Sequence, residues 1–252
     1  MTVELTDELV WIEECYDLSA ELGGAGNGVD ARTHKHVSVY LVGDDEGSVL
    51  VDSGSFLHRE AITAEVKQVL GDRSLDALVL SHSDYPHAAN VREFVGEGTE
   101  LVASSGAPEK QGLPDARKAT IGGSMEIGSR TFSFIDPPLA DRSHTTWIYD
   151  HGSETLFTAD GFGSRHRPGE CQMVSSDFDD GIAVAAIEEF HREELVWLRY
   201  VDPEKLRVAL ASILEDFPVS WVAPIHGHPI AGADLEGYLD RLIEAAGHIA
   251  EE

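Results

Sequence analysis

Short apolar runs separated by polar and Gly-rich turns dominate the first half of the chain. The runs with the length and β-branched content of strands are 10–16, 37–42, 49–51, 75–80 and 101–104. The G-D-D-E-G-S segment turns the second run into the third, which predicts a hairpin. Residues 119–134 alternate β-prone runs with turns and predict antiparallel pairing, whereas apolar spacing predicts helices at 60–70 and 90–95. The Gly-rich residues 19–36 fit neither regular state, so a long loop is expected there.

The second half changes from strands to helices. A hairpin is predicted with arms at 146–149 and 155–158, followed by an irregular excursion at 161–180 that is a candidate lid. Helical periodicity covers 182–200 and 203–214, with Asp202 as the N-cap and Pro203 as the first helical residue. A strand at 219–225 and an amphipathic helix at 233–250 complete the pattern. Because no repeat or domain-sized linker interrupts it, residues 1–252 are expected to form a single domain.

Charge narrows the classes of partner. The chain has 46 acidic and 18 basic residues, a formal net charge of −28, which argues against nucleic acid and anionic membranes as partners. Lys is scarce among the basic residues, which favours a salt-adapted protein from a halophile over an ordinary acidic one. No apolar run approaches the roughly 20 residues of a membrane helix, there is no basic leader, and two Cys do not make a disulfide scaffold. A cytoplasmic protein is expected.

The richest chemistry lies in L-S-H-S-D-Y-P-H-A-A-N, residues 80–90. His82, Asp84 and His87 fall between a predicted buried strand and a predicted helix, where α/β folds bind ligands. Imidazole and carboxylate together suit zinc, iron or manganese. Alone, this loop is only slightly better explained by a metal than by a solvated His-rich loop.

Four more candidates occur far along the chain. Asp52, Asp160 and His226 each follow a predicted strand, and His144 precedes one. Each has an ordinary structural explanation, such as a turn former or a strand-edge polar group. Their common position at strand ends indicates that a fold could gather them with His82.

This order of motifs resembles the metallo-β-lactamase superfamily over nearly the whole chain. The resemblance implies an α/β fold, an αββα sandwich of two mixed β-sheets flanked by helices. Within the superfamily, the loop and A-P-I-H-G at 223–227 are most similar to the oxygen-binding di-iron domain of flavodiiron proteins, whose central loop carries H-x-E-x-D-H. The usual hydrolase loop, H-x-H-x-D-H, has His at the position of Asp84.

The resemblance also implies a ligand set. His82, Asp84 and His144 would bind one metal, His87 and His226 the other, with Asp160 bridging them and Asp52 steadying the ligand loop from behind. Two positions depart from the family: Pro86 replaces a ligating Asp, and Asp84 is one methylene shorter than the family's Glu. The missing carboxylate leaves a pair of divalent ions less well compensated, which predicts weaker binding at the second site and weakens the redox hypothesis.

Three functions follow. The first is a non-haem di-iron oxidoreductase that reduces dioxygen or nitric oxide. No flavin site is expected within this chain, so electrons would come from a separate donor or a partner subunit; the family also implies a homodimer. The second is a zinc hydrolase using metal-bound hydroxide on a small-molecule substrate. The third is a degenerate scaffold with one metal or none, which Pro86 favours.

A few residues near the motifs are assigned by position alone. His228 and Tyr85 are candidate catalytic residues. His228 could donate a proton, but exposure to solvent is the favoured expectation for it. For Tyr85, a ring that points outward and packs on the surface is at least as well supported. His34 and His36 are expected at the surface. Cys171 is expected to be an inert thiol.

Overall fold

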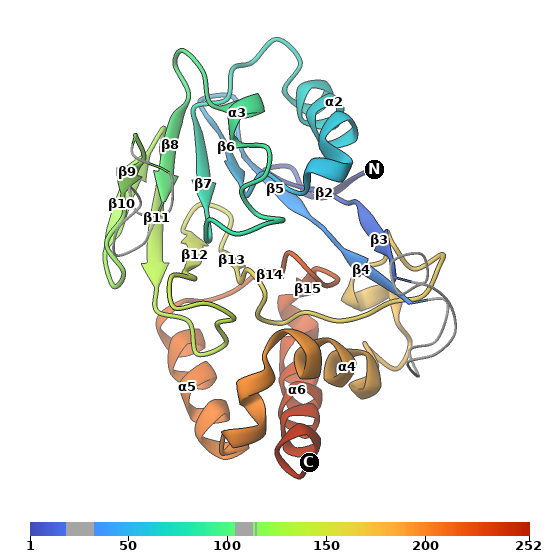
Figure 1. Cartoon of the computed structure of the whole chain (residues 1–252). Helices are drawn as coiled ribbons and strands as arrows, with labels where there is room; N and C mark the ends of the chain where they lie inside the picture. Colours follow the sequence, from blue (N-terminus) through green and yellow to red (C-terminus); the bar gives the residue numbers. More distant parts are fainter. Residues whose placement is uncertain (19–32, 104–112, 114) are drawn as a thin grey trace.

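The computed structural model describes residues 1–18, 33–103, 113 and 115–252 and contains two large mixed sheets (Figure 1). The first sheet has seven strands in the order β1-β2-β5-β6-β7-β8-β9. Its strands are β1 (Thr2–Thr6), β2 (Leu9–Ile12), β5 (Val39–Gly43), β6 (Ser48–Val51), β7 (Ala77–Leu80), β8 (Glu100–Ala103) and β9 (Arg117–Lys118). The predicted hairpin at 37–51 is confirmed as the antiparallel pair β5–β6.

The second sheet has six strands in the order β10-β11-β12-β13-β14-β15. Its strands are β10 (Ser124–Ile127), β11 (Arg130–Ile135), β12 (Trp147–Asp150), β13 (Thr155–Phe157), β14 (Trp221–Ala223) and β15 (Ile230–Ala231). The antiparallel pairs expected between 119 and 158 are present as β10–β11 and β12–β13. The strand predicted at 219–225 is shorter than expected, because it ends at Ala223, ahead of the H-G-H-P turn.

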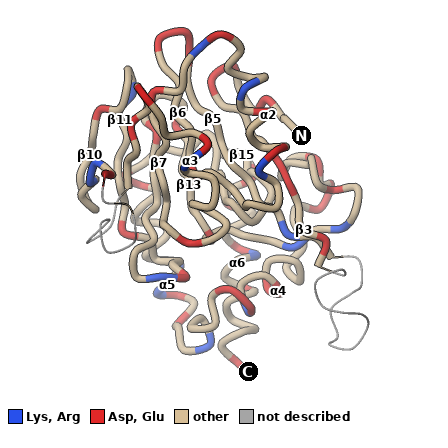
Figure 2. The backbone as a smooth tube through the Cα atoms, turned by 45° about the horizontal axis from the view of Figure 1, so that its top comes forward, with Lys and Arg blue, Asp and Glu red and all other residues tan. Residues whose placement is uncertain are grey.

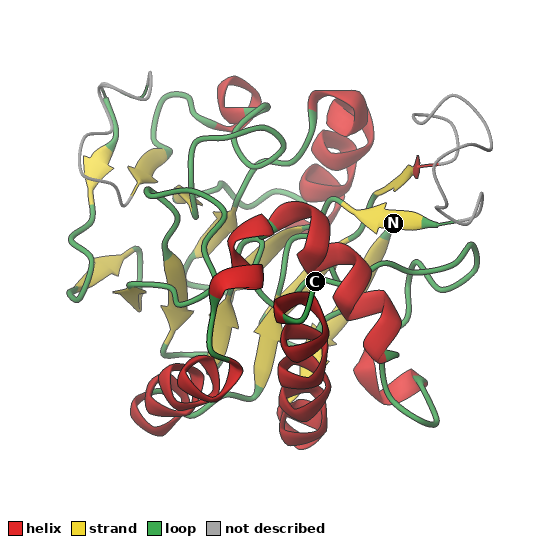
Figure 3. Cartoon of the chain, turned by 60° about the horizontal axis from the view of Figure 1, so that its bottom comes forward, coloured by secondary structure: helices red, strands yellow, loops and turns green. Residues whose placement is uncertain are grey.

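Helices cover the outer faces of both sheets (Figures 1 and 3). On the first sheet lie η1 (Phe56–His58), α2 (Arg59–Leu70) and α3 (Val91–Phe94). On the second lie α4 (Val184–Glu194), η4 (Val196–Tyr200), α5 (Pro203–Asp216), η5 (Gly232–Asp234) and α6 (Leu235–Ala250). Asp202 caps α5 as predicted, accepting from the backbone N–H groups of Glu204 and Lys205. The helix expected at 182–200 is divided into α4 and η4 at Leu195.

Three apolar layers match this arrangement. Trp11, Phe132 and Phe157 belong to the layer between the two sheets. Ile62 of α2 packs on the outer face of the first sheet, and Leu242 of α6 on that of the second. The sandwich of two mixed sheets flanked by helices is therefore confirmed.

The N-terminal region differs from the prediction. The strand expected at 10–16 is divided into β2 and β3 (Cys15–Asp17), and β3 pairs with β4 (His34–His36) in a small separate sheet. The end of the predicted 19–36 loop is thus a strand, while residues 19–32 lie outside the described part of the chain. The excursion at 161–180 is irregular as expected, apart from η3 (Ser175–Asp177), and His166 in it forms a β-bridge with His34.

Parallel pairing places the candidate residues together. β6 and β7 are parallel, as are β13 and β14, so the carboxyl ends within each pair point the same way. The Tyr40 hydroxyl donates to the carbonyl of Pro224 at 2.7 Å and ties the first sheet to the loop beyond β14. The loops that carry Asp52, His82, Asp160 and His226 therefore meet where the sheets face each other.

Acidic residues occur along most of the described backbone instead of in one segment (Figure 2). Within the described residues, no helix has the length and apolar character needed to cross a membrane.

Candidate metal centre

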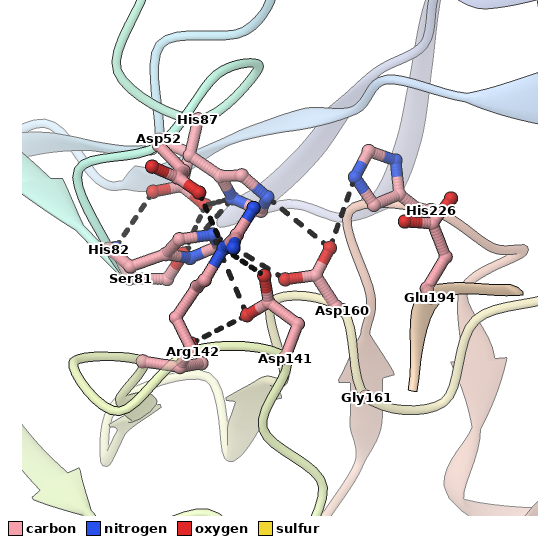
Figure 4. A network of polar contacts seen from close by, with 12 residues as sticks. Asp52, Ser81, His82, His87, Asp141, Arg142, Asp160, Gly161, Glu194 and His226 are labelled. Atoms are coloured by element: carbon pink, nitrogen blue, oxygen red, sulfur yellow. Dashed lines mark hydrogen bonds and ion pairs between the residues drawn. The ribbon is translucent and has the colours of Figure 1, made fainter. Parts of the chain in front are cut away.

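Asp160 lies at the centre of a buried cluster of imidazoles (Figure 4). Its Oδ1 lies 3.2 Å from Nε2 of His226 and 3.5 Å from Nε2 of His87. Its Oδ2 lies 3.5 Å from Nε2 of His82. One carboxylate, carried by the loop after β13, therefore faces three imidazole nitrogens that come from the loops after β7 and β14.

Asp52 fixes the loop that carries His82 and His87. Its Oδ1 accepts the backbone N–H of Ser81 at 2.8 Å, and its Oδ2 accepts the Ser81 hydroxyl at 2.7 Å. Oδ2 also lies 2.8 Å from Nδ1 of His87. A proton on Nδ1 leaves the lone pair of Nε2 directed toward Asp160, which is the arrangement that a metal-binding His requires.

A backbone contact orients His226, and the backbone around Asp160 is strained. His226 Nδ1 lies 2.6 Å from the carbonyl of His36, so it donates there and leaves Nε2 facing Asp160. Asp160 is flanked by Ala159 and Phe162, whose φ values of 49° and 63° lie in the left-handed region that favours Gly. Such strain persists only where surrounding contacts enforce it, and it is common at functional sites.

The electrostatics show that the cluster favours a positive charge at its centre. Burial opposes charge on His87, but Asp160 and Asp52 more than offset it and raise the pKa of His87 to about 10. Burial and the neighbouring His87 lower the pKa of His82 to about 3. Burial would raise the pKa of Asp160, yet His87 and His226 hold it well below its usual value. The Asp160 carboxylate is thus kept ionised, which leaves a negative charge at the position where a metal ion would bind.

Several buried atoms of the cluster have no hydrogen-bond partner among the described residues: His87 Nε2, His144 Nε2 and Asp160 Oδ2. Leaving such atoms unpaired costs about 1–3 kcal/mol each. Metal ions bound at the cluster would satisfy these atoms, so the residues present fit a metal centre.

Comparison with known proteins agrees with the fold. Residues 36–227 match the family model described as ODP family beta lactamase. The chain belongs to the ODP family of beta lactamases. It is 24% identical over 127 residues to a putative diflavin flavoprotein A 1 of Thermosynechococcus vestitus, an alignment covering 47% of this chain and 22% of that protein.

Solved structures of flavodiiron proteins share the fold of this ODP family chain. Rubredoxin oxygen:oxidoreductase of Desulfovibrio gigas is 16% identical with a TM-score of 0.77, covering 98% of this chain and 62% of that one. The flavodiiron protein of Giardia intestinalis is 15% identical with a TM-score of 0.73, covering 98% and 60%. A 1–254 fragment of a putative diflavin flavoprotein of Nostoc sp. is 14% identical with a TM-score of 0.69, covering 100% and 98%. The chain therefore spans about three fifths of the two longer flavodiiron chains.

His144 and Asp84 lie at the edge of the cluster of this ODP family member. The ring of His144 is 6.0 Å from that of His82, between centroids. The Oδ2 of Asp84 is 2.7 Å from Nε of Arg142, so a guanidinium already pairs with it. Both residues are near His82, but neither contacts Asp160 in the way the three central imidazoles do.

Sequence reasoning missed Asp141. Its Oδ1 lies 3.9 Å from Nε2 of His82, and Asp84, Asp141 and His82 have potential ligand atoms within 4.8 Å of one another. Burial and the nearby Asp160 raise the pKa of Asp141 to about 6. Its position three residues before His144 was the available signal, but no motif marks it.

The two candidate catalytic residues lie in other networks. The Tyr85 hydroxyl contacts those of Ser55, at 2.6 Å, and Tyr16, while its side chain is half exposed. His228 is buried, so the expectation of solvent exposure is wrong, and its Nδ1 lies 2.7 Å from the Met173 carbonyl. His36 is also buried, contrary to expectation, because the 161–180 excursion covers both rings.

Proposed function

We propose that this chain is a non-haem di-iron oxidoreductase that reduces a small oxidant, dioxygen or nitric oxide. The observation that supports this most strongly is the Asp160 carboxylate facing His82, His87 and His226 at 3.2–3.5 Å. A mixed imidazole and carboxylate set favours iron over the softer metals. One solved structure of the same fold is a rubredoxin oxygen:oxidoreductase, which adds support from fold alone.

In this proposal Asp160 would help to hold both of two metal ions. His87 and His226 would hold one, and His82, His144 and the carboxylates beside His82 the other. Asp141 would add a third carboxylate to the pair and so increase its total charge compensation, although it lies beside His82 and not at the second site, where Pro86 replaces the family's Asp. A bound pair of ferrous ions would supply the electrons that reduce the oxidant.

The chain's own residues would keep the site ordered. Ser81 and Asp52 hold the His87 ring in one tautomer, and the His36 carbonyl does the same for His226. Arg142, which pairs with Asp84 and lies 3.2 Å from Asp141, neutralises acidic charge at the rim near His82. Electrons would come from a separate donor protein or a partner subunit.

Metal analysis of protein purified without chelator tests the proposal. We expect two irons per chain and, in the oxidised protein, the near-ultraviolet absorption of an oxo-bridged pair. The ferrous protein, reduced chemically so that no natural donor is needed, should consume dioxygen or nitric oxide. Two zincs in place of iron, with hydrolysis of model esters, would instead establish the hydrolase, and sub-stoichiometric metal would establish a degenerate scaffold.

Asp52→Asn should weaken metal binding without removing a ligand. The amide cannot accept from both the Ser81 groups and His87 as the carboxylate does, so the His87 ring loses its fixed tautomer. Losses of about 10- to 100-fold in affinity are typical for such partners of metal ligands. Competition with a calibrated chelator measures the change. Asp240→Asn, an exposed position with the same loss of charge, should leave the affinity unaltered; equal affinities in both variants would contradict the role assigned to Asp52.

A further inference from the structure

A second group of metal-ligand side chains lies where β3 and β4 meet the 161–180 excursion. It consists of Cys15 on β3, His34 on β4, and His166 and Cys171 in the excursion. One potential ligand atom from each residue lies within 4.8 Å of the other three. Cys15 Sγ lies 3.2 Å from His166 Nε2, and Cys171 Sγ lies 3.4 Å from His34 Nδ1.

These contacts have the dimensions of a tetrahedral site. With Zn–S bonds of about 2.3 Å and Zn–N bonds of about 2.0 Å, neighbouring sulfur and nitrogen ligands are about 3.5 Å apart. Both sulfur–nitrogen distances are close to that value. Two thiolates and two imidazoles form the Cys2His2 set of structural zinc sites, which use four protein ligands and keep no open position.

The backbone holds the ligands in place independently of their side chains. His34 and His166 form an antiparallel bridge, in which each N–H donates to the other's carbonyl, at 2.8 and 3.1 Å. Cys15 is paired with His36 in the β3–β4 hairpin. Three segments far apart in sequence therefore converge on one point before any ion is considered.

The surroundings suit a bound cation better than a set of unliganded rings. The His166 ring stacks on His36 with centroids 3.8 Å apart, and His228 packs against both. Nδ1 of His36 and Nδ1 of His166 are buried without hydrogen-bond partners among the described residues. Such closely packed rings cannot all take up a second proton and become charged, so His166 is available as a neutral ligand.

We propose that Cys15, His34, His166 and Cys171 bind one zinc ion, separate from the Asp160 cluster. This ion would fasten the β3–β4 pair to the excursion. Coordination would replace the protons of both thiols, and the two thiolates would balance the charge of the ion. The two sites are linked mechanically, because β4 also provides the His36 carbonyl that orients His226. The zinc site does not depend on the proposed oxidant chemistry.

Metal counts in matched variants test this site. In wild-type protein we expect one zinc per chain in addition to any metal of the Asp160 cluster. The Cys15→Ser/Cys171→Ser double variant should lose that zinc and keep the other metals. Asp160→Ala should do the reverse, which distinguishes failure of this proposal from failure of the di-iron proposal. Unchanged zinc in the double variant would overturn the site.

Cobalt substitution provides a test that does not require a folded variant. Wild-type protein reconstituted with Co²⁺ should show thiolate-to-cobalt charge transfer and the intense visible bands of tetrahedral cobalt. The thiols should react slowly with a thiol reagent until a chelator removes the ion. A Cys15–Cys171 disulfide, seen as absence of free thiol in denatured, unreduced protein, would overturn the proposal, as would cobalt spectra without thiolate bands.

Discussion

Asp160→Ala is expected to lose both ions of the candidate metal centre and, with them, chemically driven reduction of dioxygen or nitric oxide. The carboxylate is the only group that contacts Nε2 of His82, His87 and His226 together among the described residues. Its removal also takes away one of the two negative charges that face His87. The loss in metal affinity should exceed the roughly 10- to 100-fold loss that follows substitution of a residue hydrogen-bonded to a metal ligand.

Three measurements separate this effect from unfolding. Iron per chain and oxidant consumption report on the site, and circular dichroism reports on the fold. Asp179→Ala, an exposed Asp in the excursion, is a matched control and should retain iron and activity. Asp160→Asn keeps the shape of the side chain without its charge and should also bind iron poorly. Full iron content in Asp160→Ala would show that the bridging role is wrong.

The central residues of the site were predictable because the hydrophobic pattern ends where they begin. β7 is entirely buried and stops at Leu80, so His82 had to lie at its carboxyl end. The same logic placed Asp52, Asp160 and His226 after their strands. What periodicity cannot supply is the distance between loops, which depends on how the two sheets are stacked.

The missed features have no periodic signal. β3 and β4 have three residues each, and C-Y-D and H-K-H contain too few apolar positions to alternate, so the pattern places them at a strand end and in a loop. Asp141 sits in an irregular loop where only tertiary contacts bring it toward His82. His228 follows Gly in a polar turn and looks exposed in sequence, but the excursion buries it.

Arg130→Met is expected to lower the free energy of unfolding by about 3–5 kcal/mol, the range for removing one partner of a buried ion pair. The Arg130 side chain is 4% exposed, and its Nη2 donates to Asp150 Oδ2 at 2.7 Å and to Glu8 Oε2 at 2.9 Å. It joins the β11–β12 region to the turn between β1 and β2. The variant leaves the Asp150 carboxylate, which is fully buried, without a cation.

Chemical denaturation of wild type and variant measures this loss, and Arg207→Met is the control. Arg207 pairs with Asp240 on the surface at 2.8 Å, where such a pair contributes about 0–1 kcal/mol. Both variants change the net charge equally, so general repulsion in this acidic chain cancels from the comparison. Similar losses in the two variants would show that burial of Arg130 adds nothing to its ion pair.

The pH dependence of the stability difference between wild type and Arg130→Met provides a second test of the Arg130–Asp150 pair. Although burial opposes it, the Arg130 guanidinium and Ser153 lower the pKa of Asp150 below its ordinary value. A depressed carboxyl pKa contributes stability that is complete above the unfolded pKa, about 3.9, and is lost as the pH falls through the folded pKa. In Arg130→Met the buried Asp150 carboxyl has lost its cation, so its folded pKa should lie above the wild-type one, because burial then acts without the guanidinium. The stability difference should therefore be complete above both folded pKa values and shrink as the pH falls through them. A difference that stayed unchanged into acid would mean that Asp150 is not the partner that stabilises Arg130.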